Sequence, residues 1–129
     1  EETIHGVLDL LGRVKQRADR IDELATKTAM ARSPIKLAAD EAKFTAETQM
    51  YTATRDRASR KSEFTSGREL EADAKLDSFE ARHAAHQVAQ LVEQANTAYE
   101  ILNQISWQLG GIRSDLRARL HALQFESSL

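Results

Sequence analysis

Glu80 and His83 are the residues whose types and spacing come nearest to a metal site. A carboxylate and an imidazole three residues apart on a helix point to the same side, as in the Glu-x-x-His motif of di-iron helical bundles. His86 follows His83 by three further residues and could add a nitrogen ligand. A complete site needs further inward carboxylates or a third ligand, and none stands in a clear facing position. We therefore predict no metal, with Glu80, His83 and His86 as the candidate ligands if one binds.

The chain lacks residues for several other kinds of chemistry. It contains no cysteine, which excludes disulfide bonds, thiolate catalysis and cysteine-ligated zinc. No catalytic or cofactor signature is evident, so we predict a protein that is not an enzyme and needs no cofactor.

The charge balance gives no general attraction to nucleic acid or to an anionic membrane. Eighteen Lys and Arg residues stand against twenty Asp and Glu, for a net charge of −2. The uncharged apolar runs are only a few residues long, so no membrane insertion is expected within this segment.

One local excess of positive charge lies near the middle of the chain. Its members are Arg55, Arg57, Arg60, Lys61 and Arg68. These side chains could contact phosphates or an acidic partner. They lack interleaved aromatic residues, so nucleic acid is not the expected partner. Phe64 lies in the same polar stretch, where its ring either folds back on the protein or is offered to a partner.

The longest apolar pattern lies between residues 88 and 109 and organises the expected fold. Apolar residues there alternate by three and four positions, which places them on one face of a helix. They are Val88, Leu91, Ala95, Ala98, Leu102, Ile105 and Leu109, flanked by Val92, Tyr99 and Ile101. We expect Leu102 and Ile105 to be buried at the centre of this face.

Two helices are expected before residue 65. The first is capped by Thr3 and has inward positions at Ile4, Val7, Leu11, Val14, Ala18, Ile21, Ala25 and Thr28. Ser33-Pro34 is the signal for the start of a second helix. That helix has one small face, made of Ile35, Ala39, Ala42, Ala46, Gln49 and Ala53, and one large face, made of Leu37, Phe44 and Tyr51. Either two partners cover the two faces or both are used within one bundle.

Two more helices are expected after residue 65. Ser66 followed by Glu69 matches a capping box, so a third helix begins there and ends at Gly110-Gly111. A short fourth helix then points Ile112, Leu116, Leu120 and Leu123 inward, with Phe125 closing its end. No strand pattern is present.

These elements predict an all-α fold with two possible arrangements. The first is an elongated antiparallel helical hairpin, a coiled-coil-like bundle of three long helices plus a short C-terminal helix, with a kink at Pro34. Residues then pair when their numbers sum to about 133, so Ala25 lies near residue 108. The alternative is a compact up-down four-helix bundle with a full reversal at Ser33-Pro34.

The favoured function is a non-enzymatic protein–protein interaction or assembly module, which binds a partner or a second copy through coiled-coil-like helix faces. Its predicted interaction residues are Phe44, Tyr51, Arg60, Lys61 and Phe64. The alternative is a ligand- or metal-sensing four-helix bundle with Glu80, His83 or His86 in a cavity.

The 129 residues are the size of one domain. Because the first residue is Glu1, we expect a processed form or a piece of a longer protein. The sequence gives no localisation.

Overall fold

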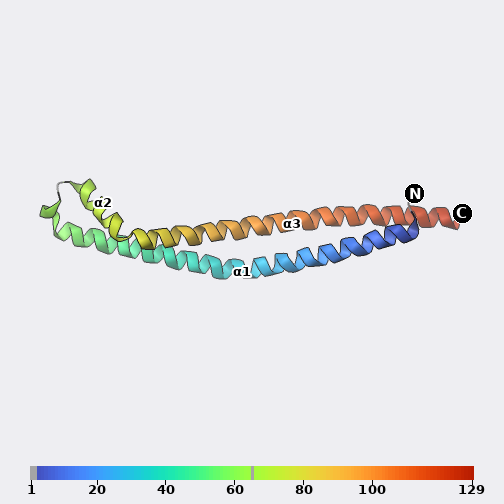
Figure 1. Ribbon diagram of the computed structural model, residues 1–129, viewed down its shortest axis with the longest axis horizontal. Coiled ribbons are helices and arrows are strands. Elements are labelled where there is room, and N and C mark those ends of the chain that lie inside the picture. The colour runs from blue at the N-terminus through green and yellow to red at the C-terminus, as the bar shows by residue number, and fades with distance from the viewer. Residues whose placement is uncertain (1–2, 65) are drawn as a thin grey trace. The chain divides into compact units, whose positions relative to one another are not determined.

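The computed structural model describes residues 3–64 and 66–129, and this part of the chain is helical with no strand. Helix α1 spans Ile4–Ser59, the 3₁₀ turn η1 spans Lys61–Glu63, α2 spans Gly67–Asp77 and α3 spans Phe79–Ser128 (Figure 1). Helices α1 and α3 pack against each other. The expected all-α class is therefore confirmed.

The chain divides into two compact units. Unit 1 consists of Glu1–Met30 and Asn96–Leu129, and unit 2 consists of Ala31–Ala95. In unit 1 the first half of α1 runs antiparallel to the second half of α3, and Ser106 Oγ donates to Asp22 Oδ1 at 3.1 Å. Ala25 lines the same groove as Asn103, five residues from the partner that the sequence pairing predicts.

Both predicted N-terminal caps are confirmed. The Gly6 amide donates to Thr3 Oγ1 at 3.0 Å, and the Glu69 amide donates to Ser66 Oγ at 3.2 Å. Each serves an amide of the first turn that has no carbonyl partner within its helix.

The expected helix boundary at Ser33-Pro34 is absent, because α1 continues through Pro34. This removes the reversal that the four-helix alternative requires at this point. Proline has no N–H, so the Met30 carbonyl loses its usual donor inside the helix. The boundary between the two units falls after Met30, at the same place in the helix.

The expected end of a helix at Gly110-Gly111 is also wrong, since α3 continues to Ser128 and no separate short C-terminal helix exists. Two helical glycines cost roughly 1 kcal/mol each relative to alanine. Inward residues on both sides, Leu109 and Leu116, hold the helix across them. An unpredicted break occurs instead at Ser78, which separates α2 from α3.

The inward face predicted for the first half of α1 is confirmed, since all eight of its residues are buried or half-buried. The face predicted for α3 needs correction. Leu91, Ala98 and Ile112 are exposed, while Val92, Tyr99 and Arg113 are more shielded. The shielded positions follow the same alternation of four and three residues in a neighbouring register: 81, 85, 88, 92, 95, 99, 102, 106, 109, 113, 116, 120 and 123.

The protected core is thin. Among the described residues, the buried hydrophobic side chains are Val7, Ala46, Ala53, Ala74 and Leu116. Leu102 and Ile105 are only half-buried, and Phe125 is exposed. Alanine buries little area, so the energy of packing in unit 2 comes from close approach of the helices rather than from large side chains.

Replacing Pro34 with Ala should stabilise the protein by about 1–3 kcal/mol, because proline within a helix costs about 3 kcal/mol relative to alanine. Thermal or urea unfolding followed by circular dichroism measures this. Ser33→Ala is the matched control and should have little effect. If Ser33 capped a separate helix, its replacement would instead destabilise the protein by about 1 kcal/mol.

Candidate interaction surface

Phe44 and Tyr51, two of the predicted interaction residues, lie on the outward face of α1 in unit 2. Their exposed fractions are 70% and 66%, and Leu37, seven residues before Phe44, is 61% exposed. Residues seven apart return to nearly the same side of a helix, so the three form one line. We call Leu37, Phe44 and Tyr51 the outer stripe. Leu37 belongs to this surface although it is not among the predicted interaction residues.

The outer stripe is bordered by acidic side chains within one helical turn. Asp40, Glu41 and Glu47 lie three or four residues from its members and are exposed. Within the described part of the chain none of these three carboxylates forms an ion pair. Arg55 is the basic residue at the same distance, next to Tyr51. The surface therefore combines apolar side chains with a local excess of negative charge.

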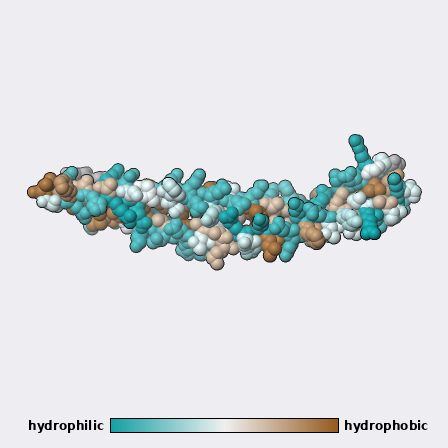
Figure 2. Space-filling view, turned by 180° about the vertical axis from the view of Figure 1, so that it is seen from behind, coloured by the Kyte–Doolittle hydropathy of each residue, from teal (hydrophilic) through white to brown (hydrophobic). Residues whose placement is uncertain are grey.

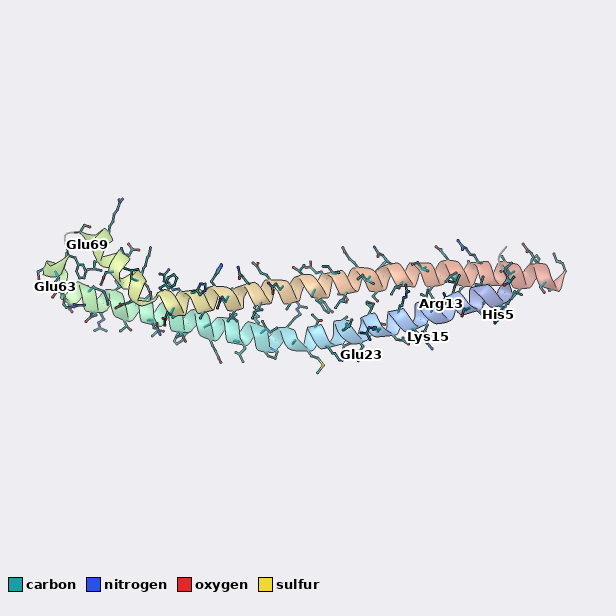
Figure 3. All side chains as sticks on the ribbon, viewed as in Figure 1. His5, Arg13, Lys15, Glu23, Glu63 and Glu69 are labelled. Carbon is teal, nitrogen blue, oxygen red and sulfur yellow. The ribbon has the colours of Figure 1, made fainter. Side chains whose placement is uncertain are left out.

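The other three predicted interaction residues lie elsewhere, at the turn of unit 2. Arg60 bonds to Asp56 at 2.7 Å and to Glu63 at 3.0 Å, and the bond to Asp56 is the main cause that raises its pKa. Lys61 is exposed and Phe64 is half-buried. Glu63 lies in η1 and Glu69 in α2, on the two sides of this turn (Figure 3). Along the axis of α1, Arg60 is about 24 Å from Phe44. The five predicted interaction residues therefore lie in two separate regions of the surface, Phe44 and Tyr51 in one and Arg60, Lys61 and Phe64 in the other.

The sequence indicates Arg57 only as one member of the basic cluster, but the structure gives it a distinct role. The residue is 8% exposed, its Nε donates to Asp73 Oδ2 at 2.7 Å, and its Nη2 donates to Asp77 Oδ2. Hydrogen bonds to Asp73 and Asp77 raise the pKa of Arg57 above its ordinary value. These two ion pairs, Arg57 with Asp73 and Arg57 with Asp77, therefore tie α2 to the end of α1. Two carboxylates four residues apart on α2 are the signal that the sequence offers for this contact.

Ser78 forms the elbow between α2 and α3. Its side chain is 1% exposed, and its hydroxyl lies 3.1 Å from the Ala74 carbonyl and 3.4 Å from Met50 Sδ. Arg82 Nε donates to the same hydroxyl at 3.3 Å, and Arg82 Nη2 donates to the Lys75 carbonyl at 2.7 Å. These bonds satisfy polar groups freed by the helix break.

The candidate metal ligands are all exposed on α3. The ring of His83 stacks on Phe79 at a centroid distance of 5.8 Å, and His86 Nε2 lies 3.3 Å from Gln90. Within the described residues, no group of three or more His, Cys, Asp or Glu side chains is placed to hold a metal ion.

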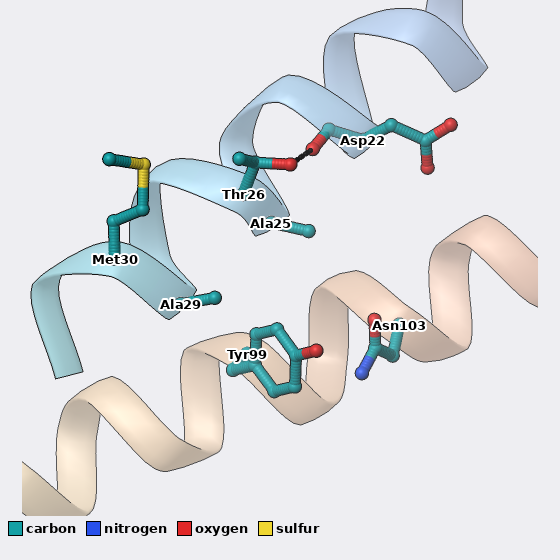
Figure 4. Close-up of a pocket in the computed structure, with 7 residues that line it drawn as sticks. All are labelled: Asp22, Ala25, Thr26, Ala29, Met30, Tyr99 and Asn103. Atoms are coloured by element: carbon teal, nitrogen blue, oxygen red, sulfur yellow. Dashed lines mark hydrogen bonds between the residues drawn. The ribbon is translucent and has the colours of Figure 1, made fainter. Parts of the chain in front are cut away.

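A shallow groove in unit 1 lies between α1 and α3 (Figure 4). It is lined by Asp22, Ala25, Thr26, Ala29, Met30, Tyr99 and Asn103. Thr26 Oγ1 donates to the Asp22 carbonyl at 2.9 Å, so this hydroxyl is engaged by its own helix. The lining mixes small apolar side chains with scattered polar ones. It shows no set of acid, base and nucleophile within hydrogen-bond reach of one another, as catalysis requires.

The comparisons with known proteins find no match: no family model, no curated protein and no solved structure resembles the chain significantly. Within the described residues, no helix is both long enough and apolar enough to cross a membrane.

Replacing Arg57 with Lys should loosen α2, because an ammonium group cannot reach two carboxylates in the fixed geometry of a guanidinium. We expect backbone amides of residues 67–77 to exchange hydrogen on the order of tenfold faster, measured by mass spectrometry. Arg60→Lys is the control, since Arg60 is more exposed. Unchanged exchange in α2 of the Arg57 variant would show that the clamp contributes nothing.

Proposed function

We propose that this chain is a non-enzymatic interaction or assembly module that binds another protein chain through coiled-coil-like helix faces. The observation that carries the proposal is the outer stripe. Soluble proteins often expose single hydrophobic residues, but a line of large ones marks an interaction surface.

The distribution of exposed side chains along α1 supports this proposal. In unit 1 the positions that continue the seven-residue spacing of the outer stripe are Asp9, Gln16, Glu23 and Met30; the first three are polar and exposed, and Met30, the last residue of the unit, is apolar and exposed. In unit 2 the equivalent positions are Leu37, Phe44 and Tyr51. The same face of α1 therefore changes from polar to apolar along the helix. A helix pair that only had to stay dissolved would not need this change.

The thin core gives a second argument. Fifteen large hydrophobic side chains among the described residues are exposed, against two that are buried, Val7 and Leu116. Covering one such side chain contributes about 1.5–3 kcal/mol, so a partner that covers several gains a substantial part of its binding energy there. The geometry favours an antiparallel helix pair in each unit, with helix faces available for packing.

A photo-crosslinking amino acid at position 44 tests the proposal in the cells that make the protein. We expect adducts with one or a few protein chains, because the position lies at the centre of the outer stripe. The matched control is the same amino acid at Gln16, which is exposed at the equivalent position of unit 1 and should give no specific adduct. If positions 44 and 51 give no more adducts than position 16, the proposed function is wrong.

A further inference from the structure

A second apolar surface lies in unit 1, along one side of the α1 and α3 pair. Leu10 and Leu24 each lie three positions after one inward residue of α1 and four positions before another, and the exposed Arg17 has the same position between them. Ala98, Ile105 and Ile112 have the same relation to the inward residues of α3. In an antiparallel pair such positions meet on one side. We call these five residues the apolar flank; Leu10, Leu24, Ala98 and Ile112 are exposed and Ile105 is half-buried.

The opposite side of unit 1 is more polar, although Leu8 there is 50% exposed and Ala29 and Met30 help to line its groove. That side carries Asp22 and Asn103, which line the groove of Figure 4, and Ser106 donates to Asp22 there. Figure 2 shows a largely hydrophilic surface on which hydrophobic side chains occur in separate spots. The two sides of the same helix pair therefore differ in how many polar side chains they expose.

The apolar flank has a basic border on α1. Arg13, Arg17, Arg20 and Lys27 lie three, four or seven residues from Leu10 or Leu24. Arg13 pairs with Asp9 at 3.1 Å and Lys27 with Glu23 at 3.0 Å, whereas Arg17 forms no ion pair with any described residue. On α3 the nearest charges are one of each sign, Asp115 and Arg119. The border is therefore positive overall.

The two apolar surfaces have borders of opposite charge. The outer stripe runs from Leu37 to Tyr51, and the flank runs from Leu10 to Leu24 on one helix and from Ala98 to Ile112 on the other. Each span is two seven-residue repeats, about 21 Å of helix. The stripe is bordered by Asp40, Glu41 and Glu47, so its close neighbours are negative where those of the flank are positive. Lys36 and Lys43 lie further round α1, roughly 100° from the stripe.

We propose that the occupant of the outer stripe is a second copy of this chain, whose apolar flank receives it. This inference rests on the proposed function and names the partner. The part of α1 that carries the outer stripe in one copy lies along the helix pair of unit 1 in the other, so that three helices pack together at the contact. Like surfaces do not pair, because two outer stripes would bring acidic borders together and two flanks would bring basic borders together. The contact therefore joins two different surfaces of the chain.

Charge reversal tests the pairing with purified full-length protein. One variant carries Arg17→Glu and Arg20→Glu in the basic border, and the other carries Asp40→Lys and Glu47→Lys in the acidic border. All four side chains are exposed, and circular dichroism checks that each variant stays helical. We expect the wild type to self-associate in sedimentation velocity runs across a concentration series. Each variant alone should associate at least about tenfold more weakly, because like charges now face each other.

Mixing the two variants in equal amounts should restore association, because the reversed border of one variant complements the reversed border of the other. A matched control carries Lys15→Glu and Arg117→Glu, which change the net charge equally on the polar side of unit 1. This control should associate like the wild type. Association of the wild type should also weaken as salt is raised.

A wild type that stays monomeric at every concentration would overturn the inference, as would variants that associate normally or a mixture that does not recover. The proposed function has a separate readout. If the purified chain is monomeric but position 44 crosslinks to a different protein in cells, the second copy is the wrong occupant and the interaction module stands. If position 44 gives no adduct at all, both fail.

Discussion

Two antiparallel helices contact each other along only one face of each helix, and this constraint governs the rest of the structure. In each unit α1 and α3 shield the residues that point toward each other, and only the short α2 of unit 2 adds a further contact, at the end of α1. The remaining three-quarters or so of each helix surface faces away from the pair, whatever residues it carries. Large apolar side chains such as Phe44 and Ile112 are exposed for this reason, not because the helices pack poorly.

Local hydrogen-bond chemistry made part of the fold predictable. Thr3 and Ser66 cap their helices as expected, because a hydroxyl that accepts from an amide three residues ahead depends only on nearby sequence. The breaks expected at Pro34 and Gly110-Gly111 did not occur. Their local cost is a few kcal/mol, and packing of inward residues on both sides of each position exceeds it. The break at Ser78 is stabilised by Met50 and Arg82, one of which is distant in sequence.

The inward face of α3 could be predicted only in part, because the helix has two apolar faces with the same seven-residue spacing. Leu91 and Val92 illustrate the difficulty, since either could begin a regular stripe and only the position of α1 decides between them. Helical periodicity shows that a face exists but not which element covers it. The same reasoning explains why Phe44 and Tyr51 could be recognised as a separate face while the role of Arg57 could not. Its partners Asp73 and Asp77 are brought near by the turn.

The small residues of unit 2 reverse the usual relation between size and tolerance to substitution. Ala46, Ala53 and Ala74 are shielded almost completely, and Ala74 has no exposed surface at all. Even one added methylene group at such a place must push two helices apart, because interiors are packed at the density of organic crystals. Leu37 or Tyr51 can be exchanged for many residues without disturbing the helix pair. The least replaceable side chains of this half of the molecule are thus among its smallest ones, while large exposed ones such as Phe44 can change without disturbing the packing.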